Sequence, residues 1–139
     1  MAKYYIDTNI WRDFVESRVD YLRPLGEFAF QFLKRVIKNK DLVIYSEFIL
    51  DELNQKYTLQ EIEKYCFKLL RDAKLIEEVP FTDRQLNEAL KVASERRVSK
   101  GDAIHAILAR DNDAVVITRD QHFTLLQDIV KSLKPEEVT

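Results

Sequence analysis

The sequence predicts an α/β fold built on a parallel sheet, and two features carry this prediction. Short apolar runs alternate with longer amphipathic stretches from one end of the chain to the other, as in strands joined by crossover helices. The 139 residues include only two glycines and three prolines, which argues against a turn-rich all-β architecture and against disordered linkers. With 46% hydrophobic residues, residues 1–139 are expected to form one domain.

The first half of the chain predicts two strands, each followed by helix. The first apolar run is apolar on both faces, as a buried parallel strand requires. Thr8 or Asn9 can cap the helix that follows, and Pro24 suits the first turn of the next one. The expected elements are a strand at 3–7, helices over about 10–18 and 24–38, a strand at 42–46 and a helix from 47 to about 57.

The second half contains two capping boxes, in which a threonine is followed three residues later by Glu or Gln. Thr58 with Glu61 and Thr82 with Gln85 therefore mark helix starts. The expected elements are a helix from 58 to about 72, a strand at 75–79, helices from 82 to about 97 and from about 102 to 111, a strand at 114–118 and a fifth strand at 129–133.

Charge and cysteine content narrow the class of protein. The 22 basic and 24 acidic residues give a net charge of −2, which excludes a binder with an obvious basic tail but not a nucleic-acid substrate. One cysteine, Cys66, cannot form an internal disulfide, so we expect a cytoplasmic protein with Cys66 in the core. A first strand at residue 3 leaves no room for a signal peptide, and no apolar stretch approaches the roughly 20 residues of a membrane span.

Four acids stand at the ends of apolar segments: Asp7, Glu52, Asp102 and Asp120. Ligands of parallel α/β folds bind at the carboxyl ends of the strands. Carboxylates gathered there repel one another unless a cation lies between them, and a hard divalent cation with oxygen ligands meets that need. The sequence therefore predicts a Mg²⁺ or Mn²⁺ site, and a metal-dependent enzyme that cleaves phosphodiester bonds.

Each acid also has a plainer interpretation. Asp7 and Asp120 can cap helices, and Asp102 can interact with a helix dipole in a first turn. Glu52 is different, because helical periodicity places Glu47 and Asp51 on a polar stripe and Glu52 on the inward side. An acid on an apolar face is costly unless it is paired or metal-bound.

Several short motifs resemble the PIN-domain family, which includes the VapC-type toxin ribonucleases. They are Tyr5-Ile-Asp7-Thr-Asn9, Ser46 with Glu52 six residues later, Gly101-Asp102-Ala-Ile-His-Ala106 and Thr118-Arg-Asp120-Gln-His-Phe123. The resemblance implies a five-stranded parallel sheet in a three-layer α/β/α sandwich. It also implies a Mg²⁺- or Mn²⁺-dependent endoribonuclease whose acidic positions fall on Asp7, Glu52, Asp102 and Asp120, with Thr118 and Asn9 in support.

The resemblance also implies a reaction and partners. Water would hydrolyse single-stranded or structured RNA to products with a 5′-phosphate and a 3′-hydroxyl. A toxin would have an antitoxin that plugs the acidic groove, and it would form a homodimer, for which Phe28, Phe30 and Phe32 could supply apolar surface. The candidate RNA-binding residues near the acids are Arg96, Arg97, Lys100 and Arg119, which could equally form a solvated charged rim.

Two other functions compete with this one. The first is a non-catalytic PIN-like interaction module in an RNA-processing assembly. The presence of all four acids argues against it, because a non-catalytic module would be expected to have lost some of them. The second is a receiver domain, which should carry a phosphoacceptor aspartate near the third strand, where residues 75–81 have none. His105, on an Ala/Ile-rich helix, is interpreted as a core residue rather than a metal ligand, and His122 as structural.

Overall fold

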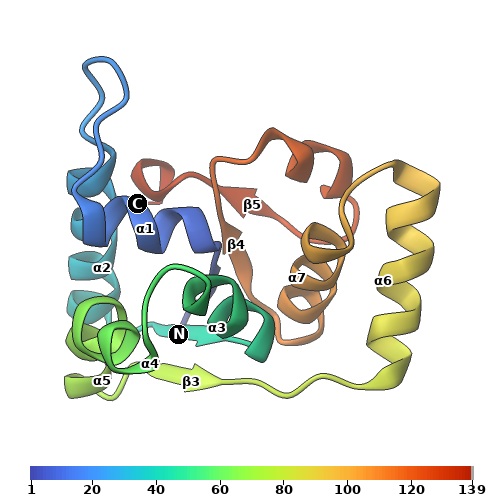
Figure 1. Ribbon diagram of the computed structural model, residues 1–139, viewed down its shortest axis with the longest axis horizontal. Coiled ribbons are helices and arrows are strands. Elements are labelled where there is room, and N and C mark those ends of the chain that lie inside the picture. Colours follow the sequence, from blue (N-terminus) through green and yellow to red (C-terminus); the bar gives the residue numbers. More distant parts are fainter. Residues whose placement is uncertain (139) are drawn as a thin grey trace.

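The computed structural model describes residues 1–138, in which five parallel strands form one sheet in the order β3-β2-β1-β4-β5 (Figure 1). The predicted five-stranded parallel α/β fold is therefore confirmed. The strands are β1 (Lys3–Ile6), β2 (Leu42–Tyr45), β3 (Ile76–Glu78), β4 (Val115–Ile117) and β5 (Ser132–Leu133). The order reverses beside β1, because the chain moves outward through β2 and β3 and then returns to β4. Such a reversal opens a crevice at the carboxyl ends of the strands.

Helices cover both faces of the sheet, which gives the predicted three layers. Neighbouring residues of β1 point to opposite faces. The Tyr4 ring packs edge-on against Phe32 of α2, with centroids 5.1 Å apart, whereas the Tyr5 ring lies 5.3 Å from His105 of α7. The helices are α1 (Thr8–Glu16), α2 (Leu25–Asn39), α3 (Glu47–Asn54), α4 (Leu59–Glu61), α5 (Lys68–Asp72), α6 (Asp83–Arg96) and α7 (Lys100–Asp111). The shorter segments are the π-helical η1 (Ile62–Phe67) and the 3₁₀ segments η2 (Gln121–Leu126) and η3 (Pro135–Glu137).

Local sequence signals place most element boundaries. Thr58 and Thr82 each form the complete predicted capping box, at α4 and α6. Several details differ from the prediction. The helix expected from 58 to 72 contains the π-helical turns of η1, α7 starts at Lys100 because Ser99 caps it, and β5 pairs over only two residues instead of 129–133.

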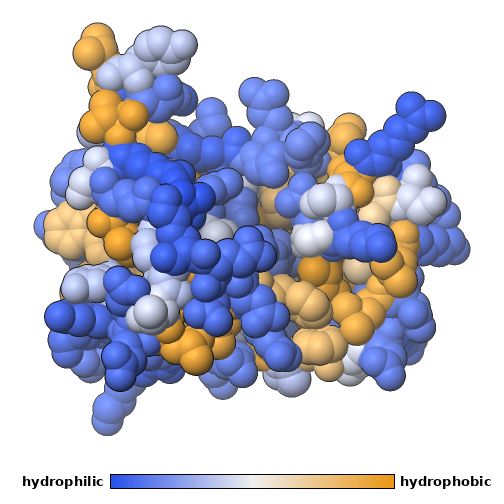
Figure 2. Space-filling model, viewed as in Figure 1, coloured by the Kyte–Doolittle hydropathy of each residue, from blue (hydrophilic) through white to orange (hydrophobic). Residues whose placement is uncertain are grey.

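A projecting arm, residues 17–24, joins α1 to α2 (Figure 1). Asp20 and Arg23 pair across it through two backbone hydrogen bonds. Its tip exposes 95% of Tyr21 and 97% of Leu22, and Figure 2 shows hydrophobic atoms at this projection. At its base, Gly26 lets the two helices approach closely, because a Cβ there would lie 2.7 Å from the carbonyl oxygen of Asp13.

The expected apolar surface on α2 is only partly available. Phe32 is fully buried in the core and cannot serve an interface, which corrects the expectation that all three phenylalanines are exposed. Phe30 remains 36% exposed and stacks on Phe14 of α1, with ring centroids 6.2 Å apart. Cys66 is buried as expected. Among residues 1–138, no helix is long and apolar enough to cross a membrane.

Candidate functional site

Asp7 and Thr118 follow directly on the two strands that flank the crevice. β1 and β4 pair in register, and the Asp7 amide donates to the Ile117 carbonyl at 2.9 Å. Asp7 caps α1, with Oδ1 accepting from the Thr8 amide at 2.8 Å, while Oδ2 accepts from the Thr118 hydroxyl at 2.8 Å. The capping interpretation of Asp7 is thus correct, and it leaves the carboxylate at the strand end where a ligand would lie.

Burial makes the charge of Asp7 unfavourable in the metal-free protein. Only 8% of the residue is exposed, and this burial raises the pKa of its carboxyl group. The Thr118 hydrogen bond opposes the rise, whereas the negative charges of Glu52 and Asp102 add to it. A carboxylate in this state is stabilised by any cation that enters the crevice.

Asp102 and Asp120 lie in the same crevice as Asp7. Asp102 lies in the first turn of α7, where Ser99 accepts a hydrogen bond from its amide, and Asp120 caps η2. Burial raises the pKa of Asp102, and the charge of Asp120 raises it further. One ligand atom from each of Asp102, Asp120 and His122 lies within 4.8 Å of the others, and Nδ1 of His122 is 2.9 Å from Oδ1 of Asp120.

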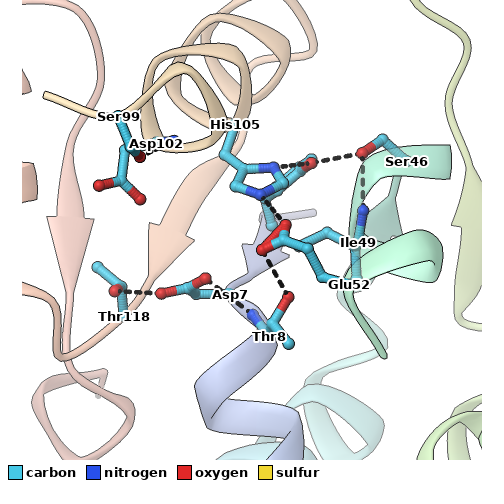
Figure 3. Close-up of polar contacts among 10 residues, drawn as sticks. Asp7, Thr8, Ser46, Ile49, Glu52, Ser99, Asp102, His105 and Thr118 are labelled. Atoms are coloured by element: carbon cyan, nitrogen blue, oxygen red, sulfur yellow. Dashed lines mark hydrogen bonds and ion pairs between the residues drawn. The ribbon is translucent and has the colours of Figure 1, made fainter. Parts of the chain in front are cut away.

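Glu52 reaches the same space from α3 (Figure 3). Its Oε1 accepts from the Thr8 hydroxyl at 3.3 Å, and its Oε2 lies 2.6 Å from Nε2 of His105. Glu47 and Asp51 are exposed, as the predicted polar stripe requires. Helical periodicity therefore selected the acid of this helix that faces inward.

His105 is a core residue, as predicted, but it is also joined to the site. Its Nδ1 lies 2.7 Å from the Tyr5 hydroxyl, which in turn lies 2.6 Å from Oγ of Ser46. Burial raises the pKa of Tyr5 far above its ordinary value, so the phenol keeps its proton. Sequence reasoning missed the link between His105 and Glu52. The available signal was the spacing of three residues from Asp102, which puts both side chains on one face of α7.

The four predicted acids line one open cavity of about 610 Å³. Arg12 and Lys56 add positive charge to its wall. They were not predicted, because the candidate basic residues were chosen for their closeness in sequence to Asp102 and Asp120. The lining residues are Asp7, Thr8, Asn9, Arg12, Glu52, Gln55, Lys56, Ser99, Asp102, Asp120 and His122. A second hollow of about 670 Å³ is lined by residues of the 59–72 helical region and by none of the four acids.

The predicted basic residues differ in their surroundings. Arg119 makes a bidentate pair with Glu136, at 2.8 and 2.6 Å, and its side chain is 15% exposed. Arg96 pairs with Asp128 and donates to the Leu125 carbonyl at 3.0 Å. Both guanidinium groups are thus engaged within the protein.

Arg97, just after α6, and Lys100, the first residue of α7, are exposed on either side of Ser99 at the cavity wall. They are therefore better placed than Arg96 and Arg119 to meet a phosphate without first breaking a salt bridge. An RNA-binding role for any of the four stays a prediction.

Comparison with known proteins agrees with this fold. The sequence matches the PIN domain family over residues 4–128. The fold is similar to a chain in a complex of FitAcB from Neisseria gonorrhoeae, with a TM-score of 0.68, 18% identity, and coverage of 97% of this chain and 99% of that one. No curated protein matches the chain in sequence.

Two further solved structures have similar folds. A chain of VapBC2 from Rickettsia felis, bound to a fragment of promoter DNA, has a TM-score of 0.66 at 17% identity, covering 95% of this chain and 98% of that one. A chain of a toxin–antitoxin complex from Klebsiella pneumoniae has a TM-score of 0.65 at 18% identity, covering 99% and 100%. At these identities the likeness concerns the fold.

Proposed function

The chain belongs to the PIN-domain family, and we propose that it is a metal-dependent endoribonuclease that hydrolyses phosphodiester bonds of RNA. One observation carries the proposal: acids from four separate parts of the chain line one open cavity at the point where the strand order reverses. Ligands of open α/β sheets bind at such points. The four acids are Asp7, Glu52, Asp102 and Asp120.

The donor set fits a hard divalent cation. Four carboxylates supply oxygen ligands, which Mg²⁺ and Mn²⁺ accept, and Mn²⁺ also accepts an imidazole such as that of His122. Burial raises the pKa values of Asp7 and Asp102, so their ionised forms are less favourable than in water and are stabilised by added positive charge. We propose Asp7, Asp102 and Asp120 as ligands, with Glu52 ligating directly or through water.

A bound divalent cation would lower the pKa of a coordinated water and stabilise charge on the phosphate. The chain itself orients the ligands. Thr118 holds one oxygen of Asp7, and the turn at η2 holds Asp120 through its hydrogen bond with the His122 amide, at 2.9 Å. Arg12 and Lys56, which lie 3.1 and 3.9 Å from the Glu16 carboxylate, would add positive charge that attracts the phosphate backbone.

We further propose that this RNA-cleaving protein is a toxin restrained by an antitoxin. The support is that structures of similar fold come from VapBC2 and from a toxin–antitoxin complex. An antitoxin would act by covering the acidic cavity. A homodimer is proposed on different grounds, because Leu22 and Phe30 expose apolar surface on the arm and on α2.

The test is cleavage of end-labelled single-stranded RNA in Mg²⁺, Mn²⁺ or EDTA. We expect metal-dependent cleavage by the wild type and a loss of at least about 100-fold in Asp7→Asn. Asp51→Asn is the matched control, since it removes the same charge from the exposed face of α3 and should leave the rate unchanged. Cleavage by Asp7→Asn at the wild-type rate would reject the mechanism. No cleavage with any metal would favour the non-catalytic interaction module.

A further inference from the structure

A buried chain of hydrogen bonds runs from the start of α3 to Glu52 on the same helix by way of two other elements. Ser46 caps α3, and its Oγ lies 2.6 Å from the hydroxyl of Tyr5 on β1. That hydroxyl is 2.7 Å from Nδ1 of His105 on α7, and Nε2 of His105 is 2.6 Å from Oε2 of Glu52. Ser46, Tyr5 and His105 are at most 2% exposed, so solvent does not compete for these bonds.

The direction of each hydrogen bond follows from the groups involved. An ionised carboxylate only accepts, so Nε2 of His105 must donate to Glu52. A neutral imidazole carries one N–H, so Nδ1 is the acceptor and the Tyr5 hydroxyl donates to it. The Tyr5 oxygen can then accept from Ser46, whose own oxygen accepts from the Ile49 amide at 3.5 Å. One tautomer and one ring orientation of His105 satisfy every partner.

Glu52 needs such support if it is to be a ligand. Its side chain is 39% exposed and has three rotatable bonds, so an unsupported carboxylate would sample several positions. The Thr8 hydroxyl contacts one carboxylate oxygen and His105 the other. Both contacts come from elements other than α3, so they fix the carboxylate relative to Asp7 and Asp102 rather than only to its own helix (Figure 3).

We propose that His105, oriented by Tyr5, is a positioning residue that fixes the Glu52 carboxylate for the divalent cation, a role that rests on the metal site of the proposed function. Groups that hydrogen-bond metal ligands typically contribute about 10- to 100-fold in metal affinity or activity. His105 also lies three residues from Asp102, so α7 supplies both a candidate ligand and the group that orients another one.

Two amide substitutions separate this role from simple packing. The amide nitrogen of Gln can take the place of Nε2, whereas the shorter Asn side chain reaches only as far as Nδ1. We expect His105→Asn and His105→Leu to weaken Mn²⁺ binding by about 10- to 100-fold in calorimetric titrations, and His105→Gln to restore most of it. Ile107→Val perturbs another buried side chain of α7 and leaves the hydrogen bond to Glu52 in place, so it should bind Mn²⁺ like the wild type.

Kinetics and spectroscopy complete the test. In RNA cleavage, kcat should fall in His105→Asn while the KM for RNA stays close to the wild-type value, because His105 does not line the cavity. Long-range ¹H–¹⁵N spectra of the metal-free wild type should show the Nε2–H tautomer, and Tyr5→Phe should disturb it. The Nδ1–H tautomer in the wild type would overturn the proposed direction of the bonds.

The outcomes distinguish the two proposals. Equal Mn²⁺ affinity in the wild type and in folded His105→Asn and His105→Leu would overturn the positioning role even if the wild type cleaves RNA. A wild type that binds Mn²⁺, is weakened by His105→Asn and rescued by His105→Gln, yet cleaves no RNA, would support the positioning role and reject the nuclease. A wild type that binds no Mn²⁺ would overturn both.

Discussion

The Thr118 hydroxyl donates to Oδ2 of Asp7 across 2.8 Å, although 111 residues separate the two in sequence. The same hydroxyl oxygen accepts from the Asp120 amide at 3.0 Å. Pairing of β1 with β4 makes this possible, because it brings the residues after both strands to one edge of the sheet. One buried hydroxyl therefore orients the side chain of one candidate ligand and the backbone of another.

Replacing Thr118 should weaken the metal site without removing a ligand. Thr118→Val keeps the shape of the side chain but deletes the donor to Asp7 and the acceptor for the Asp120 amide. We expect the Mn²⁺ concentration for half-maximal cleavage to rise by about 10-fold, as for other groups that orient metal ligands. Thr118→Ser retains the hydroxyl and should stay near the wild type. Identical Mn²⁺ dependence in the Val and Ser variants would contradict the role of this hydroxyl.

Asp7→Asn should stabilise the metal-free protein while abolishing activity. The substitution removes a buried charge, and the amide can still accept from Thr8 and face Thr118. In EDTA at pH 7.5, we expect urea unfolding to show a gain of about 1 kcal/mol in the free energy of unfolding. The exposed Asp51→Asn should change it by less than about 0.5 kcal/mol. A less stable Asp7→Asn would mean that the lost hydrogen bond outweighs the removed charge.

The Asp7 carboxyl group also predicts how the stability of the protein depends on pH. The pKa of Asp7 is higher in the folded than in the unfolded protein, so the folded state binds the proton more tightly. Its protonation therefore favours folding below the unfolded pKa, near 3.8, and this contribution is lost as pH rises through the folded pKa. The advantage of Asp7→Asn over the wild type should shrink as pH falls from 7.5 toward 3.8. An advantage that grows on acidification would contradict the raised pKa.

Cys66 should be chemically silent in the folded protein. It is 1% exposed, and burial raises the pKa of its thiol to about 12, so little thiolate exists near neutral pH. A colorimetric thiol assay at pH 8 should detect no thiol in the native protein and one thiol per chain after unfolding in guanidinium. Rapid reaction of the native protein would show that the α4–α5 region opens readily.

The arm and α2 should determine the oligomeric state. Leu22 and Phe30 are exposed apolar residues, and charges there should disrupt a homodimer that uses this surface. We expect Leu22→Asp and Phe30→Asp to halve the mass measured by light scattering. Leu90→Asp is the control, since it places the same charge on an exposed leucine of α6. An unchanged mass in both arm-side variants would exclude this interface.

The sequence by itself determined the features that depend on neighbouring residues. The capping boxes at Thr58 and Thr82 involve residues three apart, and the alternation of strand and helix reflects short-range periodicity. Helical periodicity also predicted that Glu52 faces inward and that Asp51 faces solvent. Asp7, Asp102 and Asp120, predicted from strand ends and helix starts, line one cavity with Glu52, because the carboxyl ends of parallel strands meet at one edge of the sheet.

Only the tertiary structure decided the features that join distant residues. The bond between His105 and Glu52 spans 53 positions, and that between Tyr5 and His105 spans 100. Arg119 was predicted to bind RNA because it is next to Asp120 in the sequence. In the structure its guanidinium group forms a bidentate pair with Glu136. The physical reason is the same in each case. A side chain's partners are set by how strands and helices pack, and local spacing contains no information about which distant group packing brings within about 3 Å.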